Sequence, residues 1–365
     1  MSMLKPEIFE QQKKHALLYK NSTAQERVEV LNRFEKGLLK HEEALTKALK
    51  TDLNKHAFES SIMEFSLIFA ELKAVRKELH EWISPIRPGI NWANPLASNK
   101  IHVESKGVCL ILSPWNYPVQ LTLTPLISCL AAGNTAVIKP SEFTPTVSEA
   151  IKEFVVDTFL PKEVSVVLGD GAAAAELTSM PFNHIFFTGS PAVGKLVMAS
   201  AAKNLTSVTL ELGGKSPVVI GKNYDLEDAA KKILWGKYTN AGQTCIAPDY
   251  VLLPKGKSKE FVQHIQKIYH SNYTKNGELN SDEVVCIVSE KHFSRLNSMV
   301  EEVRSKGGEI LFEGAHKPTE RLFGLTVVGN VAKESQVFQE EIFGPILPLE
   351  LTLVHSWRKF EPREL

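Results

Sequence analysis

The chain contains few cysteines, and their spacing excludes the two structures that cysteines most often build. Among 365 residues there are four, with no CxxC pair and no clustering with histidine: Cys109, Cys129, Cys245 and Cys286. Zinc sites and disulfide frameworks need such spacings. We therefore expect no bound metal, no disulfides and a reducing compartment, the cytoplasm.

An excess of charge of one sign is also missing. Lysine plus arginine and aspartate plus glutamate number 42 each. Nucleic-acid and anionic-membrane surfaces need a basic excess, so neither is expected as the main partner. The first six residues, MSMLKP, are not followed by an apolar run, and we expect no secretory leader.

One uncharged stretch is long enough to be mistaken for a membrane span. No charged residue lies between Lys106 and Lys139, and about 20 apolar residues suffice to cross a bilayer as a helix. The stretch is divided into shorter pieces by five residues: Pro114, Pro118, Pro125, Gly133 and Asn134. It therefore predicts buried strands and a buried helix, and no membrane partner.

The chain does have an ordinary globular composition and the pattern of an α/β protein. Hydrophobic residues make up 43% and charged residues 23%, which is typical of a protein with a substantial core. The length suggests two domains at about 150 residues each. Thr23 and Glu26 form a capping box that opens a helix. From residue 107 strands and helices alternate, as in a doubly wound parallel sheet. We expect strands at 107–112, 135–138, 164–167 and 184–187, helices at 121–132, 146–158, 172–178 and 192–202, and a second α/β unit from about residue 210 with the segments 218–220, 226–240, 250–253 and 259–269.

Cys245 is the strongest candidate for a reactive residue. It ends the motif GQTC at 242–245, in an expected loop, whereas the other cysteines lie in apolar segments typical of inert, buried thiols. Glu211 begins the motif ELGGK at 211–215, whose glycines leave room for a ligand and water. It could also be an ordinary carboxylate at a strand end. A thiol nucleophile and a carboxylate base are what covalent catalysis followed by hydrolysis requires.

Three further segments have the residue types of a nucleotide or oxyanion site, each with a plain structural alternative. Lys139 ends an expected strand, at the carboxyl edge where open α/β sheets bind ligands, or is simply an exposed lysine. Asn116, in SPWNYP at 113–118, could donate to an oxyanion without carrying charge, or could be a turn asparagine. The segment FFTGSPAVG at 186–194 follows a strand and opens a helix, where phosphates bind free N–H groups. Its glycine spacing departs from the GxGxxG dinucleotide motif.

Together with IKPSE at 138–142 and EEIFGP at 340–345, these motifs resemble the aldehyde dehydrogenase superfamily, most of all its class 3 branch, over residues 6–348. The resemblance implies that Cys245 is the nucleophile, Glu211 the base and Asn116 the oxyanion donor. It also implies a dinucleotide site made of Lys139 and Glu142 at the adenosine ribose, Glu341 and Phe343 at the nicotinamide side, and Gly189, Ser190, Gly194 and Leu212 elsewhere along the cofactor.

The fold implied by the resemblance is α/β and aldehyde dehydrogenase-like, with two doubly wound domains. Residues 1–84 and 107–209 would form a Rossmann-type NAD(P)-binding domain, and 210–348 a catalytic domain. Residues 85–106 would form a small oligomerisation hairpin that builds a homodimer. Residues 349–365 do not resemble the family, and we expect them to be a divergent tail after an incomplete catalytic domain.

The function we expect is oxidation of an aldehyde to a carboxylic acid, through a thiohemiacetal and a thioester on Cys245. A carboxylate near the ribose, Glu142, tends to repel a 2′-phosphate, so NAD is expected first and NADP stays open. Two alternatives also stay open. One is a truncated, non-catalytic nucleotide-binding remnant, and the other is a CoA-acylating dehydrogenase, which would not need Glu211 as a base.

Overall fold

The structure is a computed structural model that describes residues 4–89, 92–94 and 96–352. The chain divides into two compact units. The first comprises Met1–Asp52 and Ala57–Leu212, and the second comprises Leu53–His56 and Gly213–Leu365. The boundary between the units falls inside the ELGGK motif, at residue 213, whereas the sequence predicts a boundary near residue 210.

The first unit is built on a five-stranded sheet in the order β3-β2-β1-β4-β5. Every neighbouring pair is parallel. This order and direction are those of a Rossmann-type sheet, so the expected α/β fold is confirmed. The strands are β1 (Val108–Leu112), β2 (Thr135–Lys139), β3 (Val164–Val166), β4 (His184–Gly189) and β5 (Ser207–Leu212).

Helices cover both faces of this sheet because its strands are apolar on both sides. Val108, Leu110 and Leu112 belong to one apolar cluster with residues of α1, α7 and α8. Cys109 points the other way, toward Cys129 of α5. The expected capping box is present, since the Thr23 N–H donates to Glu26 Oε2 at 2.7 Å. The helices are α1 (Pro6–Tyr19), α2 (Ala24–Leu53), α3 (Ala57–Ser60), the π-helical turn η1 (Ser61–Phe65), α4 (Ser66–Trp82), α5 (Gln120–Ala131), α6 (Pro145–Thr158), α7 (Gly171–Ser179) and α8 (Pro191–Ala202).

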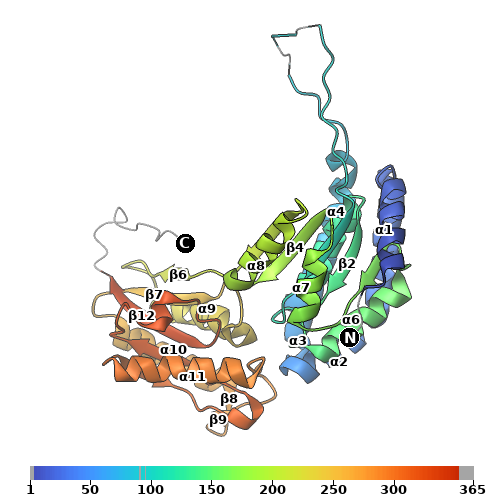
Figure 1. The fold of residues 1–365 in the computed structure, drawn as a ribbon. Helices are drawn as coiled ribbons and strands as arrows, with labels where there is room; N and C mark the ends of the chain where they lie inside the picture. The colour runs from blue at the N-terminus through green and yellow to red at the C-terminus, as the bar shows by residue number, and fades with distance from the viewer. Residues whose placement is uncertain (1–3, 90–91, 95, 353–365) are drawn as a thin grey trace. The chain divides into compact units, whose positions relative to one another are not determined.

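Between α4 and β1 the chain makes a long excursion away from the sheet of the first unit, drawn in teal in Figure 1. Ile86 and Ile101 pair across its base in antiparallel fashion, through two N–H···O bonds of 3.0 and 2.9 Å. Beyond this pair, Trp92 and Leu96 are 84% and 98% exposed. We refer to the described residues of 85–106 as the arm.

The second unit contains a five-stranded sheet in the order β10-β11-β12-β7-β6. Its strands are parallel except for β10, which runs antiparallel to β11. One face is covered by α9 and α10, whose apolar residues cluster with Val251, Leu253 and Leu347. The elements are β6 (Ser216–Val219), α9 (Leu226–Tyr238), the 3-10 turn η2 (Thr239–Gly242), β7 (Pro248–Pro254), α10 (Ser258–Tyr273), β8 (Thr274–Lys275), β9 (Glu278–Leu279), α11 (Glu290–Ser305), β10 (Glu309–Glu313), the 3-10 turn η3 (Pro318–Glu320), β11 (Thr326–Gly329), α12 (Gln336–Gln339) and β12 (Ile346–Thr352).

The start of the expected tail belongs to this sheet. The backbone of residues 349–352 continues β12 and pairs in register with Val251–Pro254 of β7. The rest of the tail, 353–365, lies outside the described residues. Among the helices that the structure describes, none combines the length and the apolar character needed to cross a membrane.

Candidate active site

In the first unit, the candidate residues follow the carboxyl ends of neighbouring strands. Leu112 at the end of β1 is in register with Lys139 on β2 and with Phe187 on β4. Thr188 and Gly189 are in register with Glu211 and Leu212 on β5. Parallel strands present their carboxyl ends at one edge, and this edge is where open α/β sheets bind ligands.

Asn116 lies in the loop between β1 and α5 and is 4% exposed. The loop ends where α5 begins, and at this point Glu64 binds its backbone through hydrogen bonds. Glu64 is fully buried on η1, and its Oε2 accepts the N–H groups of Val119 and Gln120 at 3.1 and 2.8 Å. A carboxylate at a helix amino end is favoured by the helix dipole. The sequence did not single out Glu64, because a glutamate in a helical pattern looks like a surface residue until the π-helical turn is seen.

Lys139 is buried at the end of β2 and forms an ion pair of 2.6 Å with the exposed Glu142. Pro140 follows directly, so the chain leaves the strand without starting a helix. A donor and an acceptor therefore stand side by side at the sheet edge, the arrangement that vicinal hydroxyl groups of a ribose require.

The turn from β4 into α8 contains Gly189, Ser190 and Gly194. Ser190 caps α8, because its Oγ accepts the Val193 N–H at 3.4 Å. A Cβ on Gly194 would lie 3.0 Å from Leu212 Cδ2. The small residue thus lets α8 pack closely on β5, and it brings the helix amino end to the strand that carries Glu211, which is exposed.

In the second unit, the candidate residues precede parallel strands. Gly213–Lys215 come before β6, Cys245 before β7, and Glu341 and Phe343 before β12. Because β6, β7 and β12 are parallel neighbours, these segments meet at the amino edge of the sheet. The sequence rule for carboxyl edges does not predict such a cluster.

The turn that carries Cys245 is tightly held. Asn240 and Ala241 have left-handed φ values of 52° and 51°, which cost on the order of 1–3 kcal/mol each. The side chain of the buried Gln243 ties the turn to the segment at 286–288. Its Nε2 donates to Cys286 O at 3.1 Å, and its Oε1 accepts the Val288 N–H at 3.0 Å. Cys245 itself is partly exposed and forms no disulfide.

Gly242 joins this turn to the EEIFGP motif. Its φ is +73°, and a Cβ there would lie 2.5 Å from the main-chain oxygen of Gly344. The left-handed φ disfavours any side chain, and the atom that a Cβ would meet belongs to the main chain and cannot turn aside. Only glycine therefore fits at this position. The cysteine turn and the loop with Glu341 and Phe343 therefore pack against each other within this unit.

Glu341 has an unusual environment for a carboxylate. Its Oε1 accepts the Gly214 N–H at 3.2 Å, and a Cβ on Gly213 would lie 1.8 Å from its Oε2. The net effect of its surroundings raises its pKa to about 7: burial is the largest influence and Asp249 acts in the same direction, whereas the Gly214 N–H, Lys237 and Arg295 act to lower it. Such a shifted carboxylate is typical of a functional site.

Lys237, on α9, was not singled out from the sequence. It is fully buried, and its Nζ has no hydrogen-bond partner among the described residues. Burial lowers its pKa to about 8, while the charges of Asp249 and Glu341 raise it and that of Lys215 lowers it. The lysine sits in an amphipathic helix whose sequence gives no sign that it faces inward.

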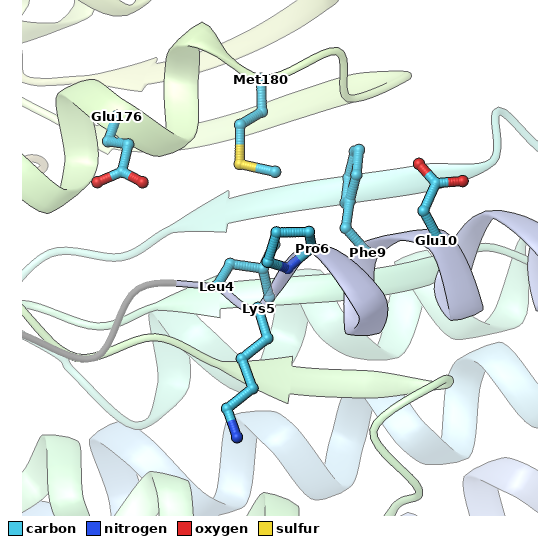
Figure 2. Close-up of a pocket in the computed structure, with 7 residues that line it drawn as sticks. All are labelled: Leu4, Lys5, Pro6, Phe9, Glu10, Glu176 and Met180. Atoms are coloured by element: carbon cyan, nitrogen blue, oxygen red, sulfur yellow. The ribbon is translucent and has the colours of Figure 1, made fainter.

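Within the described part of the chain, no group of three or more His, Cys, Asp or Glu side chains is arranged to hold a metal ion. A separate hollow of about 430 Å³ lies at the start of α1. None of the candidate residues borders it. Figure 2 shows its lining, which is Leu4, Lys5, Pro6, Phe9, Glu10, Glu176 and Met180.

Comparison with known proteins shows to which family these motifs belong. The model of the aldehyde dehydrogenase family matches residues 7–352. The chain is 40% identical to the AldX protein of Bacillus subtilis, over 94% of this chain and 77% of that protein. It is also 40% identical to aldehyde dehydrogenase family 3 member B1 of Rattus norvegicus, over 85% of this chain and 65% of that protein. The match with a family 3 member agrees with the expected class 3 branch.

Solved structures give the same result for the fold. A substrate-bound state of Staphylococcus aureus AldH superposes with a TM-score of 0.89 at 35% identity, and covers 96% of this chain and 76% of that chain. A betaine aldehyde dehydrogenase mutant of Staphylococcus aureus, solved with NAD+, superposes with a TM-score of 0.83 at 26% identity, over 94% of this chain and 70% of that chain.

Proposed function

This chain belongs to the aldehyde dehydrogenase family, and from that premise we propose that it oxidises an aldehyde to a carboxylic acid with NAD, through covalent catalysis by Cys245. The observation that carries the proposal is that Cys245 lies in a turn fixed by the hydrogen bonds of Gln243. Cys109 and Cys286 are buried, and the partly exposed Cys129 lies within α5 in contact with Cys109. Cys245 is also partly exposed, but it lies in a turn at the edge of the sheet, beside the segment with Glu341. A nucleophilic thiol needs such accessibility.

The proposed chemistry begins with the thiolate of Cys245, which forms a C–S bond to the aldehyde carbon. The Asn116 amide and the Cys245 N–H donate hydrogen bonds to the resulting oxyanion, which stabilises the charge as it develops. When bound, NAD accepts the hydride that leaves this carbon. Glu211 then takes a proton from water, whose oxygen attacks the thioester carbon. The C–S bond breaks, and the products are the carboxylic acid and the free thiolate.

The residues present fit a dinucleotide. Gly189 sits where a Cβ would lie 2.5 Å from the Phe187 ring, so the turn before α8 stays free of a side chain, and the helix amino end favours negative charge. We propose that this turn, with Ser190, Gly194 and Leu212, binds the pyrophosphate region. Lys139 and Glu142 would hold the adenosine ribose, and Glu341 and Phe343 the nicotinamide side.

We propose NAD before NADP because Glu142 places a carboxylate beside the ribose site. NAD+ is also the cofactor named for the betaine aldehyde dehydrogenase structure. A measurement of Kd for both cofactors checks this preference. Tighter binding of NADP would contradict it.

The arm supports a proposal about assembly. Trp92 and Leu96 are almost fully exposed, and large apolar side chains on a projecting segment are typical of an interface. We propose that the arm contacts a second copy of this chain in a homodimer. The four cysteines form no disulfide, and we propose a reducing compartment, the cytoplasm, as the place of action.

The decisive experiment is an assay of the purified chain with NAD and a set of apolar aldehydes. Curated relatives are named for 4,4′-diaponeurosporenal and coniferyl aldehyde, so the set should contain long-chain and aromatic members. NADH and carboxylic acid are expected in equal amounts. NADH formation that depends on added coenzyme A, with acyl-CoA as the product, would favour the CoA-acylating alternative. NAD binding without turnover would favour the non-catalytic one.

Glu211→Gln separates the two halves of the reaction. If Glu211 activates the water, the variant should form NADH in a burst of about one equivalent and then turn over slowly, because acylation proceeds and hydrolysis does not. Rapid-mixing absorbance measures both phases. Loss of the burst itself would mean that Glu211 acts before the thioester forms.

A further inference from the structure

The loop that carries Glu341 and Phe343, which we call the cofactor loop (residues 340–345), is held by charged side chains that the proposed chemistry does not use. Lys215 donates from Nζ to the main-chain oxygens of Val337 and Glu340, at 2.7 and 2.9 Å. A lysine that fills two main-chain acceptors around one turn fixes the path of that turn.

Asp249 completes this arrangement from the other side. It is 3% exposed on β7, forms a short ion pair with Lys215, and accepts the Ile342 N–H on Oδ1 at 3.1 Å. From α11, Arg295 donates to Ile342 O at 2.5 Å. Buried charges are stable only when they are paired and hydrogen-bonded in this way.

These bonds fix the backbone on both sides of Glu341. Glu340 O, Ile342 N and Ile342 O are all engaged, so the side chain between them has a defined direction. Phe343 follows with a left-handed φ of 49°, a conformation that costs a non-glycine residue on the order of 1–3 kcal/mol and persists only where its surroundings hold it.

We propose that Asp249, with Lys215 as its partner, is the positioning residue of the cofactor loop: it ties Glu341 and Phe343 to β7, the strand that begins just after Cys245. Asp249 lies four positions after Cys245 in the chain, so the anchor of the loop is on β7 and the nucleophile is in the turn directly before that strand. The inference rests on the proposed function, because it assigns Glu341 and Phe343 to the nicotinamide side of NAD.

The same aspartate acts on Glu341 through its charge. The groups that face the Glu341 carboxyl are Asp249 of β7, Lys237 of α9, Arg295 of α11 and the Gly214 N–H. Asp249 raises the pKa of Glu341, and Lys237 lowers it. Removal of the aspartate charge should therefore lower this pKa, and removal of the lysine charge should raise it.

The test uses the full chain and two readouts that do not depend on turnover with cofactor. One is the Kd for NAD from pH 5.5 to pH 9, values chosen to bracket the Glu341 pKa of about 7, by calorimetry. The other is hydrolysis of p-nitrophenyl acetate without NAD, which needs the Cys245 thiol but not the cofactor loop. Asp249→Asn keeps the size of the side chain and an acceptor for Ile342, but it loses the charge that pairs with Lys215.

We expect Asp249→Asn to weaken NAD binding about tenfold or more, a loss of about 1.4 kcal/mol, and to leave ester hydrolysis within about twofold. The pH midpoint of NAD binding should move down in Asp249→Asn and up in Lys237→Met. A purely structural role would not move the two midpoints in opposite directions. Glu340→Gln is the matched control, since only the main chain of Glu340 takes part in these bonds, and it should behave as wild type.

Unchanged NAD affinity in Asp249→Asn overturns the inference, and so does a folded variant that loses ester hydrolysis and NAD binding together. If Asp249→Asn does not fold by circular dichroism, Lys215→Gln decides the question with the same two readouts. A wild-type chain that neither hydrolyses the ester nor binds NAD refutes the proposed function itself, an outcome visible before any variant is compared.

Discussion

At the scale of single residues, the reactivity of Cys245 depends on where its turn lies. The other three thiols are placed in β1, in α5 and in a buried segment held by Leu53. The hydrogen bond with Cys109 raises the pKa of the Cys129 thiol, and burial raises it as well. A thiol with a raised pKa is a poor nucleophile at neutral pH.

Cys245→Ala should therefore abolish both aldehyde oxidation and ester hydrolysis, because no other thiol can replace it. Cys129→Ala is the control and should retain both activities. Brief iodoacetamide treatment and peptide mapping check the assignment independently. If inactivation followed modification of Cys109 or Cys286, the assignment would be wrong.

Lys237 allows a prediction about stability at the same scale. Its pKa is lowered to about 8 by burial. Below pH 8 the lysine is charged in the folded and unfolded states, and the folded state bears the whole desolvation penalty. Between pH 8 and its ordinary value of 10.5, the unfolded state binds more protons, so stability rises with pH and the penalty disappears.

Lys237→Met should consequently stabilise the chain at pH 7 by on the order of 2 kcal/mol, and the gain should shrink from pH 8 upward. Urea unfolding at pH 7, below the window from about pH 8 to 10.5, and at pH 9.5, within it, measures the change in the gain. Lys231→Met, on the exposed side of the same helix, is the control and should change little. A gain that grows with pH would contradict the burial of a charged amine.

At the scale of elements, the connection from β5 to β6 contains two adjacent glycines, Gly213 and Gly214, that differ in the space around them. A Cβ on Gly213 would overlap the Glu341 carboxylate at 1.8 Å, whereas a Cβ on Gly214 would meet only Cys245 O, at 3.8 Å. The first contact requires the Glu341 carboxylate to move, whereas the second is ordinary van der Waals contact.

Gly213→Ala should therefore push the Glu341 side chain aside and weaken NAD binding by about tenfold or more, equivalent to about 1.4 kcal/mol, with little loss of ester hydrolysis. Gly214→Ala is the matched control and should bind NAD almost normally. Calorimetric titration with NAD distinguishes them. Equal effects of the two substitutions would show that the Gly213 contact does not govern cofactor binding.

At the scale of the whole molecule, the arm presents large apolar side chains that are all more than half exposed: Ile86, Trp92, Leu96, Ile101 and Val103. Replacement of Trp92 and Leu96 by serine should weaken the proposed homodimer and leave the fold of each unit intact, since both side chains are almost fully exposed. Sedimentation velocity over a range of concentrations measures the effect. Leu205→Ser, at a residue 93% exposed elsewhere in the first unit, is the control. A dimer that survives the arm substitutions would exclude the arm as its contact.

Much of the architecture could be predicted from local sequence. The expected strand at 135–138 is Thr135–Lys139, and the expected helix at 192–202 is Pro191–Ala202. Buried parallel strands are continuous apolar runs, and the helices between them begin at recognisable prolines and caps. Pro125 shows the limit of such signals, because it lies inside α5 rather than at its end.

The sequence by itself determined the α/β fold, the family, and the motifs that contain Cys245, Glu211 and Glu341, because each is a short pattern of neighbouring residues. Only the tertiary structure decided which side chains surround them. Asp249 and Ile342 are 93 residues apart, and Glu64 and Val119 are 55 apart. Such pairs meet through strand register and helix packing, which arise from the whole fold, and no local period of the chain encodes them.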